Sequence, residues 1–197
     1  MLFLSQPMNA QEEGATTGSL NGHEWVDLGL PSGTKWATCN VGANAPEQYG
    51  NHYAWGETKP KDEYTQSNSV TYQLQMSDIA GNPQYDAATA NWGEGWKMPT
   101  RTQMEELIIR CTWEWIKQNG VRGYKGTGPN GNSIFFPAAG NWSHTSFTDG
   151  SCGYIYYWSS SPYSSDTDFS FVLRFDSGFS IFGLGRFIGC SVRPVRE

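Results

Sequence analysis

The chain has 197 residues, which is enough for one large domain or two small ones with a sizeable buried core. Charged residues make up only 16% of it, against about 25% in an average soluble protein, while 15% are aromatic and 23 residues are glycine. This composition favours short strands and many turns over a helical bundle, and it excludes disorder beyond about the first twenty positions. The net charge is −6 and the basic residues are scattered, so binding to nucleic acid or insertion into a membrane is not expected.

The N-terminal segment differs from the rest of the chain. Its apolar run of Leu2, Phe3 and Leu4 is shorter than the core of an export signal, but residues 7–11 are typical of the end of one. We therefore predict a disordered leader or signal-peptide remnant at residues 1–21 and a single domain at 22–197. The same reasoning predicts that the protein is exported, to the cell surface or the extracellular space.

Short strands are predicted at the start of this domain. Residues 24–30 alternate between apolar and polar side chains and stop at a Pro-Ser-Gly turn signal. A second short strand is expected at 35–41, and residues 53–56 form a third apolar stretch. Residues 57–91 are polar and irregular, which indicates a long loop.

One strong helix signal follows Pro99. Thr100 and Gln103 have the spacing of a capping box, in which each residue satisfies a backbone N–H of the other. The apolar positions that follow share one helical face, which predicts packing against a core: Met104, Leu107, Ile108 and Cys111. We predict a helix near residues 100–110.

The second half of the chain is predicted to consist mainly of hairpins. Asn119-Gly120 between two apolar flanks is the strongest short-range hairpin signal, and a further turn at 128–132 leads into a strand at 133–137. From Tyr154 to Val195 short strands alternate with Ser/Gly turns. The predicted fold class is therefore α+β, with mainly short antiparallel strands and one clear helix.

The sequence shows no catalytic constellation. His23, His52 and His144 lack the spacing of metal ligands, and no nucleotide-binding or nucleophile motif is present. Asp166 and Asp168 are two residues apart, as in calcium loops, but the remaining ligands and the glycine of such a loop are missing. We expect a protein that is not an enzyme and that uses no metal or cofactor.

Residues 154–190 instead have the composition of a binding surface, with many Tyr and Phe among Ser, Gly and Asp. Within them, Phe169, Phe171, Leu173 and Phe175 alternate, and their shared face is predicted to be core. The stretch 179–189 has no clean period and many glycines, so burial and an exposed apolar interaction patch are equally compatible with it. The predicted ligand-binding residues are Tyr154, Tyr156, Trp158, Tyr163, Asp166, Asp168, Phe179, Phe182, Leu184, Phe187, Ile188 and Cys190.

Six segments carry a resemblance to a known family. They are residues 22–43 (GHEWVDLGLPSGTKWATCNVGA), 53–58 (YAWGET), 95–100 (GWKMPT), 136–140 (FPAAG), 157–161 (YWSSS) and 191–195 (SVRPV). In this order they resemble the Fibrobacter succinogenes major paralogous domain, which is common in exported proteins of gut Bacteroidetes. The resemblance implies a C-type-lectin-like fold, similar to formylglycine-generating enzymes and to the variable proteins of diversity-generating retroelements. In that fold the termini meet as strands and a C-terminal region presents the ligand site.

The resemblance also suggests that the C-terminal region is diversified. Such retroelements mutate adenines, and changes in the first two bases of an Asn codon cannot produce Lys, Gln, Glu, Met or Trp. The stretch Tyr163–Val192 contains none of these five residue types. A serine- and glycine-rich β region would also contain few of them, so diversification is a hypothesis that the codons can test.

The function predicted from the sequence is a non-catalytic adhesin-like or receptor-like domain with a C-terminal binding surface. Phe182 and Phe187, as apolar anchors, favour a protein ligand over a glycan. One alternative is a structural accessory domain of a surface fibre, and another is a formylglycine-generating type of oxidase that uses Cys152 and Cys190. Cys39 and Cys111 are the candidates for a disulfide, although the sequence does not fix the connectivity.

Overall fold

A computed structural model describes residues 16–150, 154–175 and 178–197 as a single, mostly β domain with a few short helices. The helices are α1 (Ala87–Trp92), α2 (Arg101–Arg110) and the 3-10 helix η1 (Gln66–Asn68). The strands are β1 (Thr17–Leu20), β2 (His23–Asp27), β3 (Lys35–Ala37), β4 (His52–Tyr53), β5 (Thr112–Gln118), β6 (Val121–Thr127), β7 (Ser133–Pro137), β8 (Asn141–Ser143), β9 (Ser146–Thr148), β10 (Ile155–Pro162), β11 (Phe169–Phe175), β12 (Ser180–Gly185), β13 (Cys190–Ser191) and β14 (Val195–Arg196). The predicted predominance of short antiparallel strands is confirmed, and only β10 and β13 pair in parallel within the described residues.

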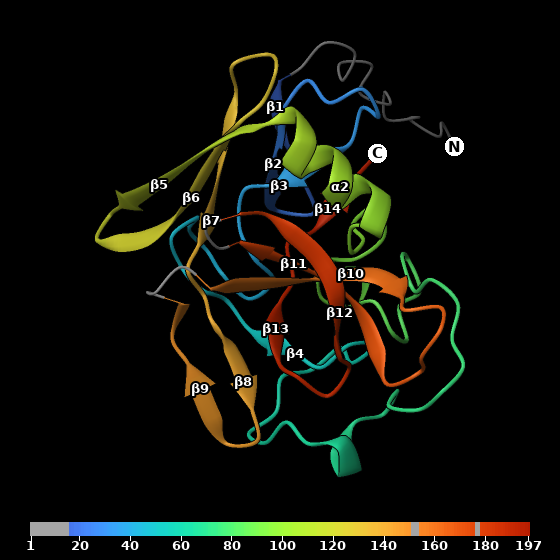
Figure 1. Ribbon diagram of the computed structural model, residues 1–197. Coiled ribbons are helices and arrows are strands. Elements are labelled where there is room, and N and C mark those ends of the chain that lie inside the picture. Colours follow the sequence, from blue (N-terminus) through green and yellow to red (C-terminus); the bar gives the residue numbers. More distant parts are fainter. Residues whose placement is uncertain (1–15, 151–153, 176–177) are drawn as a thin grey trace, which may run out of the picture.

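The two ends of the described chain meet in one sheet. Its strand order is β1-β2-β3-β14, and Val195 of the last strand lies opposite Trp36. Figure 1 shows β1, β2, β3 and β14 together at the end of the molecule that also carries α2. The predicted domain boundary at residue 22 is too late, because Thr17–Leu20 already form β1 and pair with β2. Residues 1–15 lie outside the described part of the chain.

A five-stranded sheet in the order β12-β11-β10-β13-β4 separates two apolar clusters. Successive residues of a strand point to opposite faces, so Trp158 and Val172 enter one cluster while Tyr157 and Leu173 enter the other. A sheet covered on both faces buries more of its residues than a period-2 pattern predicts.

Burial on both faces changes the expectation for β11. Leu173 and Phe175 are buried, as predicted for their face. The prediction is wrong for Phe169, which is 37% exposed at the start of the strand, and Phe171 is only half-buried. On the opposite face, Ser170 is buried although it is polar, and its hydroxyl accepts a hydrogen bond from the buried guanidinium of Arg186.

The predicted helix is α2, and it has the predicted capping box. Thr100 Oγ1 accepts a hydrogen bond from the backbone N–H of Gln103, whose side chain accepts one from the backbone N–H of Thr100. Met104 and Leu107 are fully buried against the sheet, and the helix ends at Arg110 as expected.

The hairpin predicted around Asn119-Gly120 is also confirmed. β5 and β6 pair along their whole lengths, and both turn residues have positive φ (46° and 89°), as a two-residue hairpin turn of type I′ requires. β7 follows at Ser133–Pro137, after the predicted turn.

Residues 57–91 form a long irregular segment as expected, but the helix at its end was not predicted. Asp86 caps α1, and its carboxylate accepts hydrogen bonds from the backbone N–H groups of Ala88 and Thr89. Two further N–H groups, of Gly81 and Met98, donate to the second oxygen of this carboxylate. The buried carboxylate of Asp86 therefore joins the turn at Gly81, the first residues of α1 and the backbone at Met98.

Candidate functional site

A cleft of about 710 Å³ lies beside η1 and the β8–β9 hairpin. Figure 1 shows these two elements at the end of the molecule away from α2. Three segments that are distant in the sequence line the cleft. The lining residues are Thr65, Gln66, Ser67, Tyr72 and Gln73 from the long loop, His144 from the hairpin, and Phe187 from the turn after β12. Its volume is within the range of ordinary small-molecule binding sites.

Backbone hydrogen bonds fasten the hairpin to the other two segments. Tyr64 and His144 exchange two N–H···O bonds of 3.0 and 2.8 Å, which join the long loop to the hairpin. Trp142 and Gly189 exchange a second pair of 2.8 and 2.9 Å, which joins the hairpin to the Phe187 turn. Gly189 is needed for this approach, because a Cβ there would lie 2.6 Å from the ring of Tyr64.

A buried arginine joins the Phe187 turn back to the long loop. Arg186 is 1% exposed and lies between β11 and the loop. Its guanidinium donates to oxygens on both sides: Phe169 O (3.1 Å) and Ser170 Oγ (3.0 Å) on β11, and Thr71 O (3.0 Å) and Leu74 O (2.7 Å) on the loop. Planar multi-donor geometry of this kind is available to arginine and not to lysine. All three walls of the cleft are thus connected to one another.

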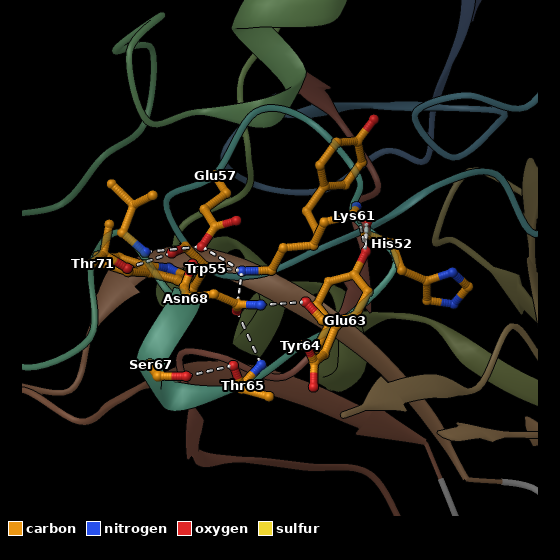
Figure 2. A network of polar contacts seen from close by, with 12 residues as sticks. His52, Trp55, Glu57, Lys61, Glu63, Tyr64, Thr65, Ser67, Asn68 and Thr71 are labelled. Atoms are coloured by element: carbon orange, nitrogen blue, oxygen red, sulfur yellow. Dashed lines mark hydrogen bonds and ion pairs between the residues drawn. The ribbon is translucent and has the colours of Figure 1, made fainter. Parts of the chain in front are cut away.

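The wall around η1 is supported by the polar network drawn in Figure 2. Lys61 Nζ donates to Glu57 Oε1 at 3.0 Å and to Asn68 Oδ1 at 2.9 Å. The same Asn68 oxygen accepts a hydrogen bond from the backbone N–H of Thr65, and Glu57 also accepts one from the N–H of Val70. Because Lys61 and Glu57 are mostly covered by neighbouring residues, their ion pair is screened less than an exposed pair. The network fixes Thr65–Ser67 at the edge of the cleft.

Tyr72 links the cleft to a residue that the sequence predicted. Its hydroxyl donates to Asp168 Oδ2 at 2.8 Å, and this hydrogen bond raises the pKa of Tyr72 above its ordinary value. The ring of Tyr72 lies edge-on to Phe187, with centroids 6.0 Å apart and planes at 83°. Tyr72 therefore contacts two residues of the predicted site: Phe187, which lines the cleft, and Asp168, which does not.

Two lining residues have a backbone conformation that is unusual for their type. Gln73 has φ 62° and His144 has φ 55°, in the left-handed region. His144 is in the two-residue turn of the β8–β9 hairpin, where such a φ is common. Gln73 occupies a turn that is closed by the hydrogen bond from the N–H of Leu74 to Thr71 O. Its position in this turn has a positive φ, which glycine adopts with less backbone strain.

The other predicted site residues are spread over several surroundings. Tyr154 is 49% exposed and Asp166 is exposed, whereas Tyr156 and Tyr163 are half-buried. Asp166 accepts the backbone N–H of Asp168 and shapes that turn. These residues do not line the cleft.

The apolar residues of the predicted surface mostly pack inward. Phe179 packs against one apolar cluster, and Phe182 and Leu184 pack against the other. The exposed apolar patch that was one of two alternatives for this stretch is therefore not formed by these side chains.

Three predicted ligand-binding residues are corrected by their burial. Trp158 and Cys190 are fully buried, and Ile188 is 9% exposed in the same cluster. Trp158 Nε1 donates to Tyr53 O at 2.8 Å, which gives the indole a structural role. Trp158 on β10 and Cys190 on β13 are core residues because apolar clusters cover both faces of this sheet.

The structure contradicts one of the two roles predicted for the cysteines. The candidate disulfide between Cys39 and Cys111 is wrong: both are free thiols, and they pack against different apolar clusters. Burial raises the pKa of Cys190 well above its ordinary value, which makes this thiol a poor nucleophile or copper ligand. Cys152, its proposed partner in an oxidase, lies outside the described residues.

The sequence reasoning missed the residues of the long loop that line most of the cleft. Thr65–Ser67, Tyr72 and Gln73 belong to a segment that showed no periodicity and no motif. The signal available was the presence of Tyr72 in a polar loop, but nothing in the sequence indicated which side of the domain the loop covers.

Among the described residues, no group of three or more His, Cys, Asp or Glu side chains lies close enough to hold a metal ion. In the same part of the chain, no helix is both long and apolar enough to cross a membrane. Comparisons with protein-family models, with curated proteins and with solved structures each found no match to this chain.

Proposed function

We propose that the chain is a non-catalytic ligand-binding domain and that the cleft between η1, the β8–β9 hairpin and the Phe187 turn is its binding site. The observation that carries this proposal is the fastening of three distant segments around an open cleft by two pairs of backbone hydrogen bonds and the buried Arg186. A site that is already ordered before binding avoids the entropy cost of ordering its loops. Such preorganisation is typical of small-molecule sites.

We further propose that the fold is C-type-lectin-like and that the family resemblance found in the sequence is genuine. Support comes from the β1-β2-β3-β14 sheet, in which the N-terminal and C-terminal strands meet, as that fold implies. The long irregular loop and the C-terminal turn both contribute to the cleft, which agrees with a ligand site near the C-terminus.

The preference for a protein ligand needs revision in this proposal. It depended on Phe182 and Phe187 as exposed apolar anchors, but both rings are half-buried and pack against an apolar cluster. Only Phe187 contributes to the lining of the cleft. The chemistry of the ligand therefore has to be read from the whole lining.

Protein-observed NMR with a library of small uncharged fragments tests the site without assuming a ligand. We expect the hits to shift the amide signals of residues 65–73, 143–145 and 186–188, because preformed binding clefts collect fragments. Clustering of the hits at another pocket, such as the one lined by His23 and Trp92, would show that the site is elsewhere. Absence of any cluster together with concentration-dependent self-association would favour the structural accessory domain.

Export and retroelement diversification remain predictions of this proposal. Six suspected variable positions contact the apolar clusters, so their replacement would change the core as well as any surface: Phe179, Phe182, Leu184, Phe187, Ile188 and Cys190. The gene locus tests diversification. A nearby near-copy with Asn codons at these positions, beside a reverse-transcriptase gene, would establish it, and a locus with neither would leave a fixed sequence.

A further inference from the structure

The seven residues that line the cleft include no carboxylate, ammonium or guanidinium group. Their polar groups are hydroxyls, carboxamides and one imidazole, from Thr65, Gln66, Ser67, Gln73 and His144, next to the Tyr72 phenol. Hydroxyl and carboxamide groups offer both donors and acceptors, which complements a ligand whose own groups do the same. A ligand rich in neutral hydroxyl groups has this property at almost every position.

Two of these side chains are available for such a ligand. The carboxamides of Gln66 and Gln73 are exposed and have no hydrogen-bond partner within the described part of the chain. Gln73 also has a positive φ of 62°, a backbone conformation in which glycine would be less strained. An unpartnered amide held at a costly backbone position is readily explained if the side chain contacts a ligand.

The apolar part of the lining includes two aromatic rings beside the methyl and methylene groups of Thr65, Gln66 and Gln73. Tyr72 and Phe187 meet edge-on at the cleft, and the hydrogen bond to Asp168 fixes the position of the tyrosine. The C–H groups on one face of a pyranose ring are weakly positive and apolar, so they pack on the negative face of an aromatic ring. Aromatic rings beside a few convergent polar groups form a common pattern in small-molecule sites.

We propose that this cleft binds a neutral oligosaccharide, with one sugar ring against Tyr72 or Phe187 and its hydroxyls bonded to the carboxamides of Gln66 and Gln73. The hydroxyls of Thr65 and Ser67 bond each other at 3.1 Å, and their remaining acceptor sites take further hydrogen bonds from the sugar. This inference rests on the proposed function, since it assigns a ligand class to the same cleft. The contacts named need no metal ion.

Other ligand classes fit the cleft less well. An anionic ligand would find no lysine or arginine in the lining and would face the nearby carboxylate of Asp168. A peptide that binds through apolar anchors would need deep apolar pockets. The cleft instead has polar side chains along both the loop and hairpin walls.

A printed panel of neutral oligosaccharides, with sialylated and sulfated ones as charged counterparts, tests the proposal in the presence of EDTA. The strongest neutral hit is then titrated by calorimetry against the wild type, Gln66→Ala and Gln73→Gly. Gln75→Ala is the matched control, because Gln75 is exposed in the same loop but outside the cleft. Gln66→Ala removes only an unpartnered exposed amide, and Gln73→Gly relieves the positive φ, so both variants should fold.

We expect at least one neutral oligosaccharide to bind, with affinity about tenfold lower in each cleft variant and unchanged in the control. Binding only of charged glycans, loss of binding in EDTA, or equal weakening by Gln75→Ala would overturn the proposal. So would a panel without any hit. If the panel is negative but uncharged fragments still cluster in the cleft, only the ligand class is wrong, whereas failure of both experiments refutes the binding site itself.

Discussion

Replacement of Arg186 by methionine should destabilise the domain and release the long loop from the cleft. The side chain is buried, donates four hydrogen bonds, and lies 4.4 Å above the ring of Trp55. Methionine fills a similar volume, but it leaves the carbonyl oxygens of Thr71, Leu74 and Phe169 without their charged donor.

The size of the effect follows from these lost contacts. Hydrogen bonds to a charged group are each worth about 1.5–3 kcal/mol, but they are not additive, and breaking a buried network typically costs about 3–5 kcal/mol. We therefore expect a loss of about 4 kcal/mol in the free energy of unfolding, which is a large part of the about 5–15 kcal/mol of an ordinary domain. Arg186→Lys should lose about half as much, because an ammonium group cannot reach both sides.

Urea denaturation followed by tryptophan fluorescence measures this loss, and hydrogen exchange at the backbone N–H of Leu74 measures the local release of the loop. Arg122→Met is the control, because Arg122 is exposed and should change stability by less than about 0.5 kcal/mol. If Arg186→Met cost no more than this control, the guanidinium would not be what holds the loop to the sheet.

Three further predictions test other parts of the structure. Thr100→Ala should cost about 1 kcal/mol in thermal or urea unfolding because it removes the cap of α2, and an equal effect of the exposed control Thr102→Ala would contradict this reading. Burial lowers the pKa of His52 below its ordinary 6.5, only partly opposed by its hydrogen bond to a backbone carbonyl, so the unfolded state binds the proton first and stability falls as the pH drops below about 6.5. The stability difference between wild type and His52→Gln should therefore shrink by up to about 1.4 kcal/mol per pH unit between pH 6.5 and the lower folded-state pKa, and a difference that is constant from pH 8 to 5 would refute it. In a Cys152→Ser background, iodoacetamide should alkylate Cys39 without reductant and Cys111 much more slowly, because burial raises the pKa of Cys111 to about 11. If mass spectrometry in denaturant shows that either thiol is labelled only after reduction, the two cysteines form a disulfide after all.

Local signals in the sequence were sufficient where a few neighbouring residues decide the structure. The capping box of Thr100 and Gln103 fixed the start of α2, and Asn119-Gly120 specified the β5–β6 hairpin, because both depend on hydrogen bonds and φ angles within a few positions. The scarcity of charge and the regular turn residues likewise indicated a domain of short strands. α1 escaped prediction because its main support, the buried carboxylate of Asp86, also depends on N–H groups outside the helix.

Tertiary structure alone decided which of the C-terminal side chains reach solvent and where the candidate site lies. Period-2 alternation says that neighbours on a strand face opposite ways, but not that apolar clusters cover both faces of the central sheet and so bury Trp158 and Cys190. An arginine in a glycine-rich stretch is expected at the surface, and Arg186 is buried only because carbonyl groups from residues more than a hundred positions away surround it. The cleft has the same origin, since Gln73, His144 and Phe187 become neighbours through long-range hydrogen bonds that no local pattern encodes.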